Sequence, residues 1–212
     1  IYTERKECKY NVSLPNNRKC RLVVYLMDDF ICQDWLPFAT FGMSSNGGWA
    51  KVDSLYCVAG VYDLNSSNFK LSYLKHEAQH VDDYKRFPRL VPPQGYSTSK
   101  RALREALFLC SLKEYRAKLV EIVYAKTNGA LTSFLNQAAD DPNAPHRVAA
   151  LKIVKELKND FDLADDEGLL QISSKRLSKA AASLFTKSTD WLEKLENKSL
   201  GKVCSVMDAD FT

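Results

Sequence analysis

The sequence predicts an α+β fold in which a small, mostly antiparallel N-terminal sheet precedes a helical part. Runs of β-branched and aromatic residues separated by turn signals lie in the first third, and apolar residues at helical spacing dominate the rest. At 212 residues with 45% hydrophobic residues, the chain can bury one core of ordinary size. We therefore expect a single domain over residues 1–212, strand-rich at 1–70 and helical at 71–212.

Two extended segments are expected in the strand-rich part. Residues 21–27 (RLVVYLM) form a β-branched and aromatic run bounded by charged residues. Residues 52–62 supply the second segment, in which Gly60 can form a bulge or kink. Turn-forming residues at 44–48 and 63–67 bound this second segment on both sides.

The first expected helix runs from about residue 72 to 86. Ser72 can cap it, and Leu74, Ala78 and Val81 lie on one face that would turn inward. Pro88 cannot continue a helix and ends this one. Four further helices are expected at residues 99–126, at 130–139, from after Pro145 to about 158, and at 173–197.

Charge and hydropathy exclude two kinds of partner. The net charge of +4 is mild, and the basic residues are scattered among acidic ones. A nucleic-acid-binding surface usually carries a basic stripe interleaved with aromatic residues, so we expect no nucleic-acid partner. No run of about eighteen apolar residues occurs, so we expect no membrane span. Residues 1–6 do not have the pattern of a signal peptide and are typical of the start of a processed chain.

Six cysteines are spread along the chain without a CxxC pair, which argues against a cysteine zinc site. Their even number favours disulfides in an exported protein, and therefore a secreted or extracytoplasmic location. Cys8 with Cys20 and Cys32 with Cys57 are the expected local pairings. Six reduced, buried thiols in a cytosolic protein are the alternative.

The segment His76-Glu77-Ala78-Gln79-His80 carries the strongest chemical signal in the chain. Side chains four residues apart share one face of a helix, so the two imidazoles can bind one metal ion together. Glu77 lies near that metal without having to ligate it. This is the HExxH arrangement of zinc peptidases. The alternative is an exposed polar helix segment.

A catalytic zinc needs a third protein ligand beside an open position for water. Asp83 and Arg86 stand where the metzincin pattern HExxHxxGxxH requires glycine and histidine, which excludes that subclass. The remaining common ligand is a carboxylate from a second helix. Asp83, three residues after His80, has three alternative roles: a ligand of an aspartate-type site, an acceptor for an imidazole N–H, or a solvated charge.

Glu114 is the first candidate for the third ligand. It is centred on an otherwise small and apolar stripe of the helix expected at 99–126, where an unpaired carboxylate is costly. Glu121 is the second candidate, and Glu105, on the opposite side of the helix, is the third. The alternative is that Glu114 only pairs with Lys118 at the surface.

The pattern His76-Glu77-x-x-His80 with Glu114-x-x-Ala117 on a downstream helix resembles the gluzincin group of zinc metallopeptidases, over about residues 60–125. The resemblance implies a zincin-like helical part that carries the active-site helix. It also implies that the strand before this helix, here within 52–62, forms the edge of the cleft and pairs with an extended peptide. Lys118 stands where the thermolysin-like members carry an aspartate.

This interpretation predicts a zinc-dependent peptidase in which His76, His80 and Glu114 hold Zn2+. Glu77 accepts a proton from a water that the metal activates, and then passes it to the leaving amine. The expected partner is a protein or peptide substrate, and the sequence makes no prediction of an oligomeric state. A zincin-like binding module with a metal but little turnover is the first alternative, and a metal-free helical domain is the second.

A second group must stabilise the developing oxyanion beside the metal. His146, the third histidine, stands at the start of a helix and is the first candidate. Tyr115 and Tyr124 are alternatives. His146 also fits an ordinary residue at the N-terminus of a helix.

Overall fold

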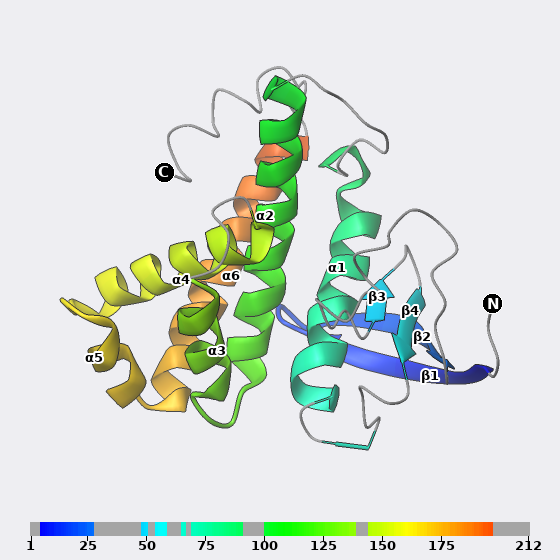
Figure 1. Ribbon diagram of the computed structural model, residues 1–212, viewed down its shortest axis with the longest axis horizontal. Helices are drawn as coiled ribbons and strands as arrows, with labels where there is room; N and C mark the ends of the chain where they lie inside the picture. Colours follow the sequence, from blue (N-terminus) through cyan, green and yellow to red (C-terminus); the bar gives the residue numbers. More distant parts are fainter. Residues whose placement is uncertain are drawn as a thin grey trace. The chain divides into compact units, whose positions relative to one another are not determined.

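The computed structural model is an α+β structure in which four strands precede the helices, which confirms the expected fold class (Figure 1). The chain divides into two compact units, residues 1–82 and 83–212, and the division falls inside helix α1 (Leu74–Arg86), which belongs to both. The structure describes residues 5–27, 48–50, 54–58, 65–66, 69–90, 100–138 and 144–196.

Strands β1 (Arg5–Leu14) and β2 (Arg18–Met27) form an antiparallel hairpin. Three residues, Pro15 to Asn17, connect the strands, and the N–H of Arg18 donates to the carbonyl oxygen of Pro15 at 3.4 Å. Asn16 and Asn17 have φ of 58° and 56°, and asparagine tolerates such values at the centre of a turn. Strand β1 was not predicted, although Cys8, Tyr10, Val12 and Leu14 alternate with polar residues there, as expected for a strand buried on one face.

The sheet order is β1-β2-β4-β3. Strand β4 (Ser54–Val58) runs parallel to β2, and β3 (Gly48–Ala50) runs antiparallel to β4. The strand within 52–62, expected to form the edge of the cleft, is thus an inner strand of the described sheet, with β3 paired to its other side. Gly60, where a bulge was expected, lies outside the described residues.

Helix α1 begins differently from the expected cap at Ser72. A π-helical turn, Phe69–Tyr73, leads into α1, and the hydroxyl of Ser66 accepts the backbone N–H of Phe69 at 3.1 Å. The ring of Phe69 anchors this turn, because it is buried and lies edge-on to Tyr10 of β1 with ring centroids 6.3 Å apart. Ser72 therefore lies within the π-helical turn.

Two polar contacts fasten α1 to the β1–β2 hairpin within the first unit. Arg18 donates from Nη2 and Nε to the carboxylate of Asp82, at 2.6 and 2.9 Å. Lys75 donates from Nζ to the carbonyl oxygen of Ser13 at 2.8 Å. These contacts lie at the two ends of the α1 segment that carries the histidines, so both ends of that segment are held.

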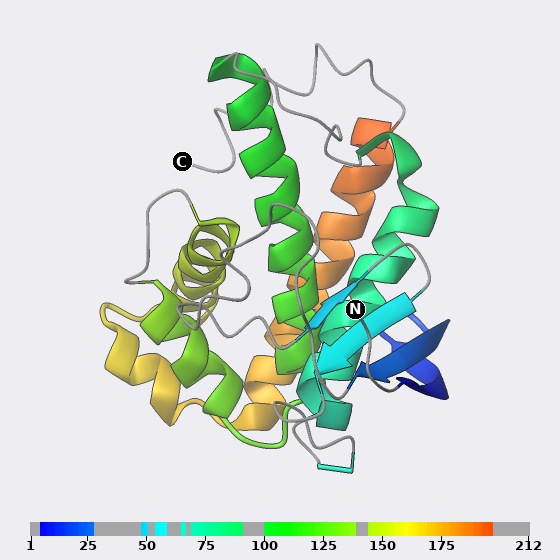
Figure 2. The same ribbon diagram turned by 45° about the vertical axis from the view of Figure 1, so that its right-hand side comes forward.

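The second unit is helical, as expected, and α2 is its central helix, because it packs against both α4 and α6 (Figures 1 and 2). Among the described α-helices, the short α5 was not predicted. Asp165 caps its N-terminus by accepting the N–H of Gly168 at 2.8 Å. The helices of this unit are α2 (Lys100–Tyr124), α3 (Gly129–Gln137), α4 (Pro145–Phe161), α5 (Asp166–Gln171) and α6 (Ser174–Glu196), with a 3₁₀ turn at Pro88–Leu90.

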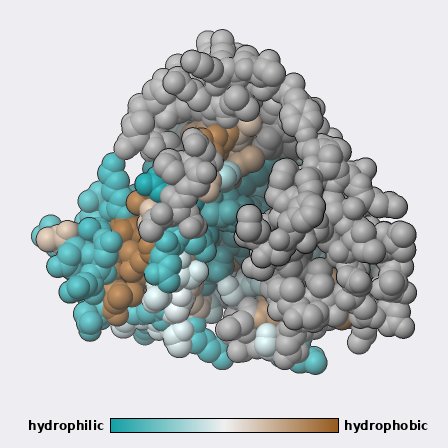
Figure 3. Space-filling view, viewed as in Figure 1, coloured by the Kyte–Doolittle hydropathy of each residue, from teal (hydrophilic) through white to brown (hydrophobic). Residues whose placement is uncertain are grey.

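The buried side chains of α2, α4 and α6 form the core of the second unit. They are mostly leucine, isoleucine and phenylalanine, including Leu109, Leu119, Ile153, Leu157 and Phe185. The described helices are mostly hydrophilic on the face drawn in Figure 3. Among the described residues, no helix combines the length and the apolar character that crossing a membrane requires.

Candidate metal centre

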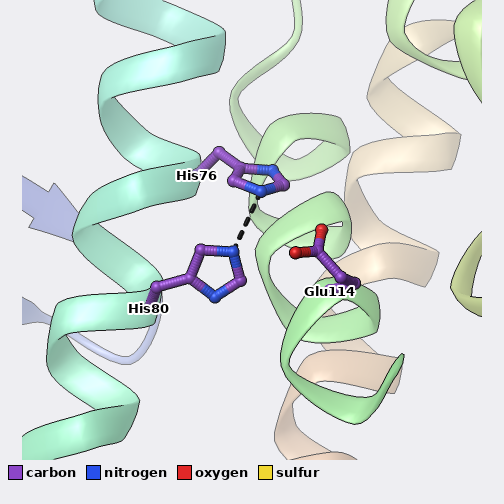
Figure 4. A group of neighbouring side chains, drawn as sticks. All are labelled: His76, His80 and Glu114. Atoms are coloured by element: carbon purple, nitrogen blue, oxygen red, sulfur yellow. Dashed lines mark hydrogen bonds between the residues drawn. The ribbon is translucent and has the colours of Figure 1, made fainter. Parts of the chain in front are cut away.

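The two histidines of α1 project from successive turns of one helix face (Figure 4). Their Nε2 atoms are 3.1 Å apart, the rings are nearly perpendicular, and each residue is only 9% exposed. Two imidazoles that bind one zinc at about 2.0–2.1 Å with tetrahedral angles have nitrogens roughly 3.3 Å apart. The observed spacing of His76 and His80 is thus close to that of a zinc-bound pair.

Glu114 of α2 completes a group of three ligand-type side chains with His76 and His80. One ligand atom from each of the three residues lies within 4.8 Å of the others, and the carboxylate points toward the rings (Figure 4). The other expected third ligands, Glu121 and Asp83, are not part of a group of this kind among the described residues. The side chain of Glu105 lies outside the described residues.

A buried ionic network in the second unit fixes α1 against α2. Arg116 of α2 donates from Nε to both carboxylate oxygens of Asp83 on α1, at 2.9 and 3.1 Å. Its Nη1 donates to the hydroxyls of Ser188 and Thr189 on α6, at 2.7 and 3.0 Å. The network therefore holds the last turn of α1, which begins at Asp83, to α2 and α6 within this unit.

The network corrects the expectation that Asp83 is a solvated charge. Its side chain is 1% exposed and pairs with a guanidinium that is 0% exposed. Asp83 therefore anchors the helix three residues after His80. The signal that sequence reasoning missed was Arg116, a cation two residues after Glu114.

His146 lies against the proposed carboxylate ligand. Its Nδ1 is 2.9 Å from Oε2 of Glu114, an ion-pair distance whose angles are not those of an aligned hydrogen bond. The imidazole is 55% exposed and the glutamate side chain 15% exposed. His146 thus holds Glu114 from the solvent side, at the first turn of α4.

The alternative in which Glu114 forms an ion pair with Lys118 at the surface does not match the structure. Lys118 is buried, donates from Nζ to the side-chain carbonyl of Gln137, and lies 4.5 Å from the ring centroid of Phe134. The described ion-pair partner of Glu114 is His146.

Glu77 follows the first histidine and stands outside the three-ligand group, as its expected role as a base requires. It is half-buried, and its charge acts on the thiol of Cys57 in β4. Burial, chiefly, and this carboxylate raise the pKa of Cys57 to about 12, whereas the Tyr73 side chain works in the opposite direction. Glu77 therefore lies on the side of α1 that faces the sheet.

Tyr115, one of the alternative oxyanion stabilisers, already forms a hydrogen bond within the helical unit. Its hydroxyl donates to Oε2 of Glu156 on α4 at 2.5 Å, and the residue is 3% exposed. Burial and the charge of Glu156 raise the pKa of Tyr115. Burial also raises the pKa of Tyr124, which is half-buried near the end of α2.

Sequence reasoning also missed Lys113, a buried cation beside Glu114 in the chain. Its Nζ lies 3.7 Å from the ring centroid of Tyr84 and has no hydrogen-bond partner among the described residues. Burial lowers the pKa of Lys113 to about 8, against the opposing effect of Asp83. An unpaired ammonium in this position has to be stabilised largely by the aromatic face.

The described cysteines, Cys8, Cys20, Cys57 and Cys110, carry free thiols. The expected pairing of Cys8 with Cys20 is wrong for a geometric reason. Cys8 lies opposite Val24 and Cys20 opposite Val12, so the two are four residues out of register, roughly 13 Å along the strands. A disulfide needs α-carbons closer than about 7 Å. Cys32, the expected partner of Cys57, lies outside the described residues.

Comparison with known proteins adds no relative: no family model, curated protein or solved structure matches the chain. Evidence for a function therefore comes from the side chains themselves, above all from the grouping of His76, His80 and Glu114.

Proposed function

We propose that the protein is a zinc-dependent peptidase whose metal ligands are His76, His80 and Glu114. The observation that carries this proposal is the 3.1 Å spacing of the two Nε2 atoms, with a carboxylate in the same group. Two histidines and a glutamate form one of the usual ligand sets of catalytic zinc. Structural zinc sites use four protein ligands, whereas catalytic sites use three and keep a position for water.

Zinc bound by these residues would lower the pKa of a water molecule and polarise a substrate carbonyl. Glu77 accepts the proton of the attacking water and delivers it to the leaving amine. Its position supports this role, because it neighbours His76 on the same helix without joining the ligand group.

His146 has two roles in this proposal. Through Nδ1 it orients the carboxylate of Glu114, as outer partners of metal ligands commonly do. Through Nε2, on the other side of an exposed ring, it donates to the substrate oxyanion. Both roles use one imidazole in one orientation, since Nδ1 and Nε2 point away from each other.

The second candidate function is a zincin-like binding module, which binds the metal but has little or no catalytic turnover. The observation that favours it is the position of β4 inside the sheet. An extended peptide can add to a sheet only at a free edge, and β3 occupies the edge next to β4. A substrate that pairs with this side of the sheet would have to pair with β3, which has only three residues.

Metal content tests the first part of the proposal. Protein purified without added metal is expected to contain about one zinc per chain, and His80→Ala and Glu114→Gln are expected to lose most of it. Glu121→Gln is the matched control, because it removes a carboxylate from the same helix outside the ligand group. Wild-type protein without zinc, or equal losses in Glu114→Gln and Glu121→Gln, would overturn this ligand set.

Turnover separates the two candidates. Casein or a peptide library is incubated with zinc-loaded wild type and with Glu77→Gln. A peptidase is expected to lose activity by about 10²- to 10⁴-fold in the variant while it retains its zinc. Equal activity of the two proteins would exclude Glu77 as the base. A zinc-loaded wild type that cleaves nothing would favour the binding module.

A further inference from the structure

A cavity of about 220 Å³ lies in the helical unit, between α2, α4 and α6. Its apolar wall is formed by Leu112, Leu184 and the indole of Trp191. Trp191 is itself held in place by an edge-on contact with Phe108, with ring centroids 5.6 Å apart. One wall of the cavity is therefore a fixed aromatic surface, suited to a flat apolar group.

Polar side chains line the rest of the cavity in a defined arrangement. Glu156 accepts a hydrogen bond from the hydroxyl of Tyr115 at 2.5 Å through Oε2. Its other oxygen lies 3.2 Å from Nζ of Lys152. The single carboxylate of the lining is thus engaged on both oxygens, by a buried phenol and by an ammonium.

The second lysine of the lining, Lys187, differs from Lys152. It stands on α6 one turn before Trp191, is exposed, and forms no ion pair with a described residue. The lining therefore carries two ammonium groups against one carboxylate whose charge is already compensated. The side chains that line the cavity therefore have a net positive charge, which is located at Lys187.

We propose that this cavity binds a small organic acid, with a flat apolar body against Trp191 and a carboxylate at Lys187. The volume limits the body to one or two rings, because pockets for drug-sized ligands begin at about 300 Å³. An anion satisfies the surplus charge, whereas a cation would meet the uncompensated ammonium of Lys187. None of the lining residues belongs to the candidate metal centre, so the site is independent of the proposed peptidase activity.

The buried network links this cavity to α1. Ser188 lines the cavity and accepts a hydrogen bond at 2.7 Å from Arg116, which holds Asp83 of α1. Ser188 also donates to the carbonyl oxygen of Phe185 at 2.7 Å. Its hydroxyl is therefore used by the protein, and the ligand's polar contact is assigned to Lys187.

The test compares two probes of equal shape and opposite charge, 2-naphthoate and 2-naphthylmethylamine, by isothermal titration calorimetry. Naphthoate is expected to bind at least about tenfold more tightly than the amine. Lys187→Gln is expected to weaken naphthoate binding about fivefold, because it removes the charge from an exposed position that the fold does not need. Lys179→Gln, an exposed lysine of α6 outside the cavity, is expected to leave binding unchanged.

Location is tested by nuclear magnetic resonance of the indole N–H of Trp191, identified by its loss in Trp191→Phe. This resonance is expected to shift when naphthoate is added, equally in zinc-loaded and chelator-treated protein, which separates the result from the peptidase proposal. Three outcomes would each overturn the inference: the amine binds as tightly as naphthoate, Lys187→Gln binds like wild type, or the Trp191 resonance does not move at about 1 mM naphthoate.

Discussion

Arg116 and Asp83 form an ion pair from which solvent is excluded, with side chains 0% and 1% exposed and Nε within 3.1 Å of both carboxylate oxygens. The neighbouring aspartate, Asp82, pairs instead with Arg18, whose side chain is 36% exposed. Two consecutive acidic residues of α1 thus face two different environments, one dry and one partly hydrated. These two ion pairs hold the helix that carries the two histidines.

Asp83→Asn is expected to lower the free energy of unfolding by about 3–5 kcal/mol, because it leaves the guanidinium of Arg116 buried without its counter-charge. Asp82→Asn is the control, and a loss of about 1 kcal/mol is expected, since Arg18 can rehydrate. Urea unfolding followed by circular dichroism measures both. Equal losses in the two variants would contradict the difference in burial.

His146→Ala is expected to weaken zinc binding by about 10- to 100-fold, because Glu114 loses the partner that orients its carboxylate. Stability should hardly change, since the imidazole is exposed at the start of α4. Competition with a chromogenic chelator measures the affinity, and Lys155→Gln, an exposed position on the same helix, is the control. Unchanged affinity in His146→Ala would show that Glu114 does not depend on this contact.

Cys57 is expected to resist alkylation in the folded protein over a wide pH range. Its pKa rises from 9.0 to about 12 on folding, so its thiol stays protonated where an unfolded thiol has already ionised. At about pH 8 only about one molecule in 10⁴ carries the reactive thiolate. Iodoacetamide labelling followed by mass spectrometry should find Cys57 unmodified from about pH 7 to about pH 10 and modified after denaturation. Rapid native labelling at pH 8 would contradict this burial.

Lys113→Met is expected to raise the free energy of unfolding at neutral pH by about 1 kcal/mol. The substitution keeps an apolar stem over Tyr84 and removes an ammonium that is 7% exposed and has no hydrogen bond among the described residues. The gain is limited because the contact with the aromatic ring, worth about 0.5–2 kcal/mol, is lost. Thermal unfolding measures it, and a destabilised variant would show that the aromatic contact outweighs desolvation.

Local sequence patterns predicted most of the helices, because helical periodicity and breakers act within a few residues. The helix expected at 72–86 is observed as α1, and the helix expected at 99–126 is observed as α2. The alternation of apolar and polar residues in β1 is also a local pattern, although no strand was predicted there. Helix α5 is too short to show a helical period.

Local sequence patterns could not predict the order of the strands or their register. Nothing near residues 54–58 in the sequence indicates that β3 would cover them, because the pairing of two strands depends on how the connecting chain folds back. The Cys8–Cys20 pairing failed for the same reason. Closeness in sequence says little about register once a hairpin turn at Asn16 and Asn17 fixes which residues lie opposite.

The spacing of His76 and His80 in the sequence is enough to place them on one helix face with Glu77 beside them, because the pitch of an α-helix allows no other arrangement. The sequence also limited the third ligand to a few acidic residues. Local patterns did not indicate which acidic residue groups with the histidines, that Asp83 pairs with Arg116, or that His146 lies against Glu114. These choices depend on the packing of α1, α2, α4 and α6, and the energies of packing come from contacts between residues far apart in the chain.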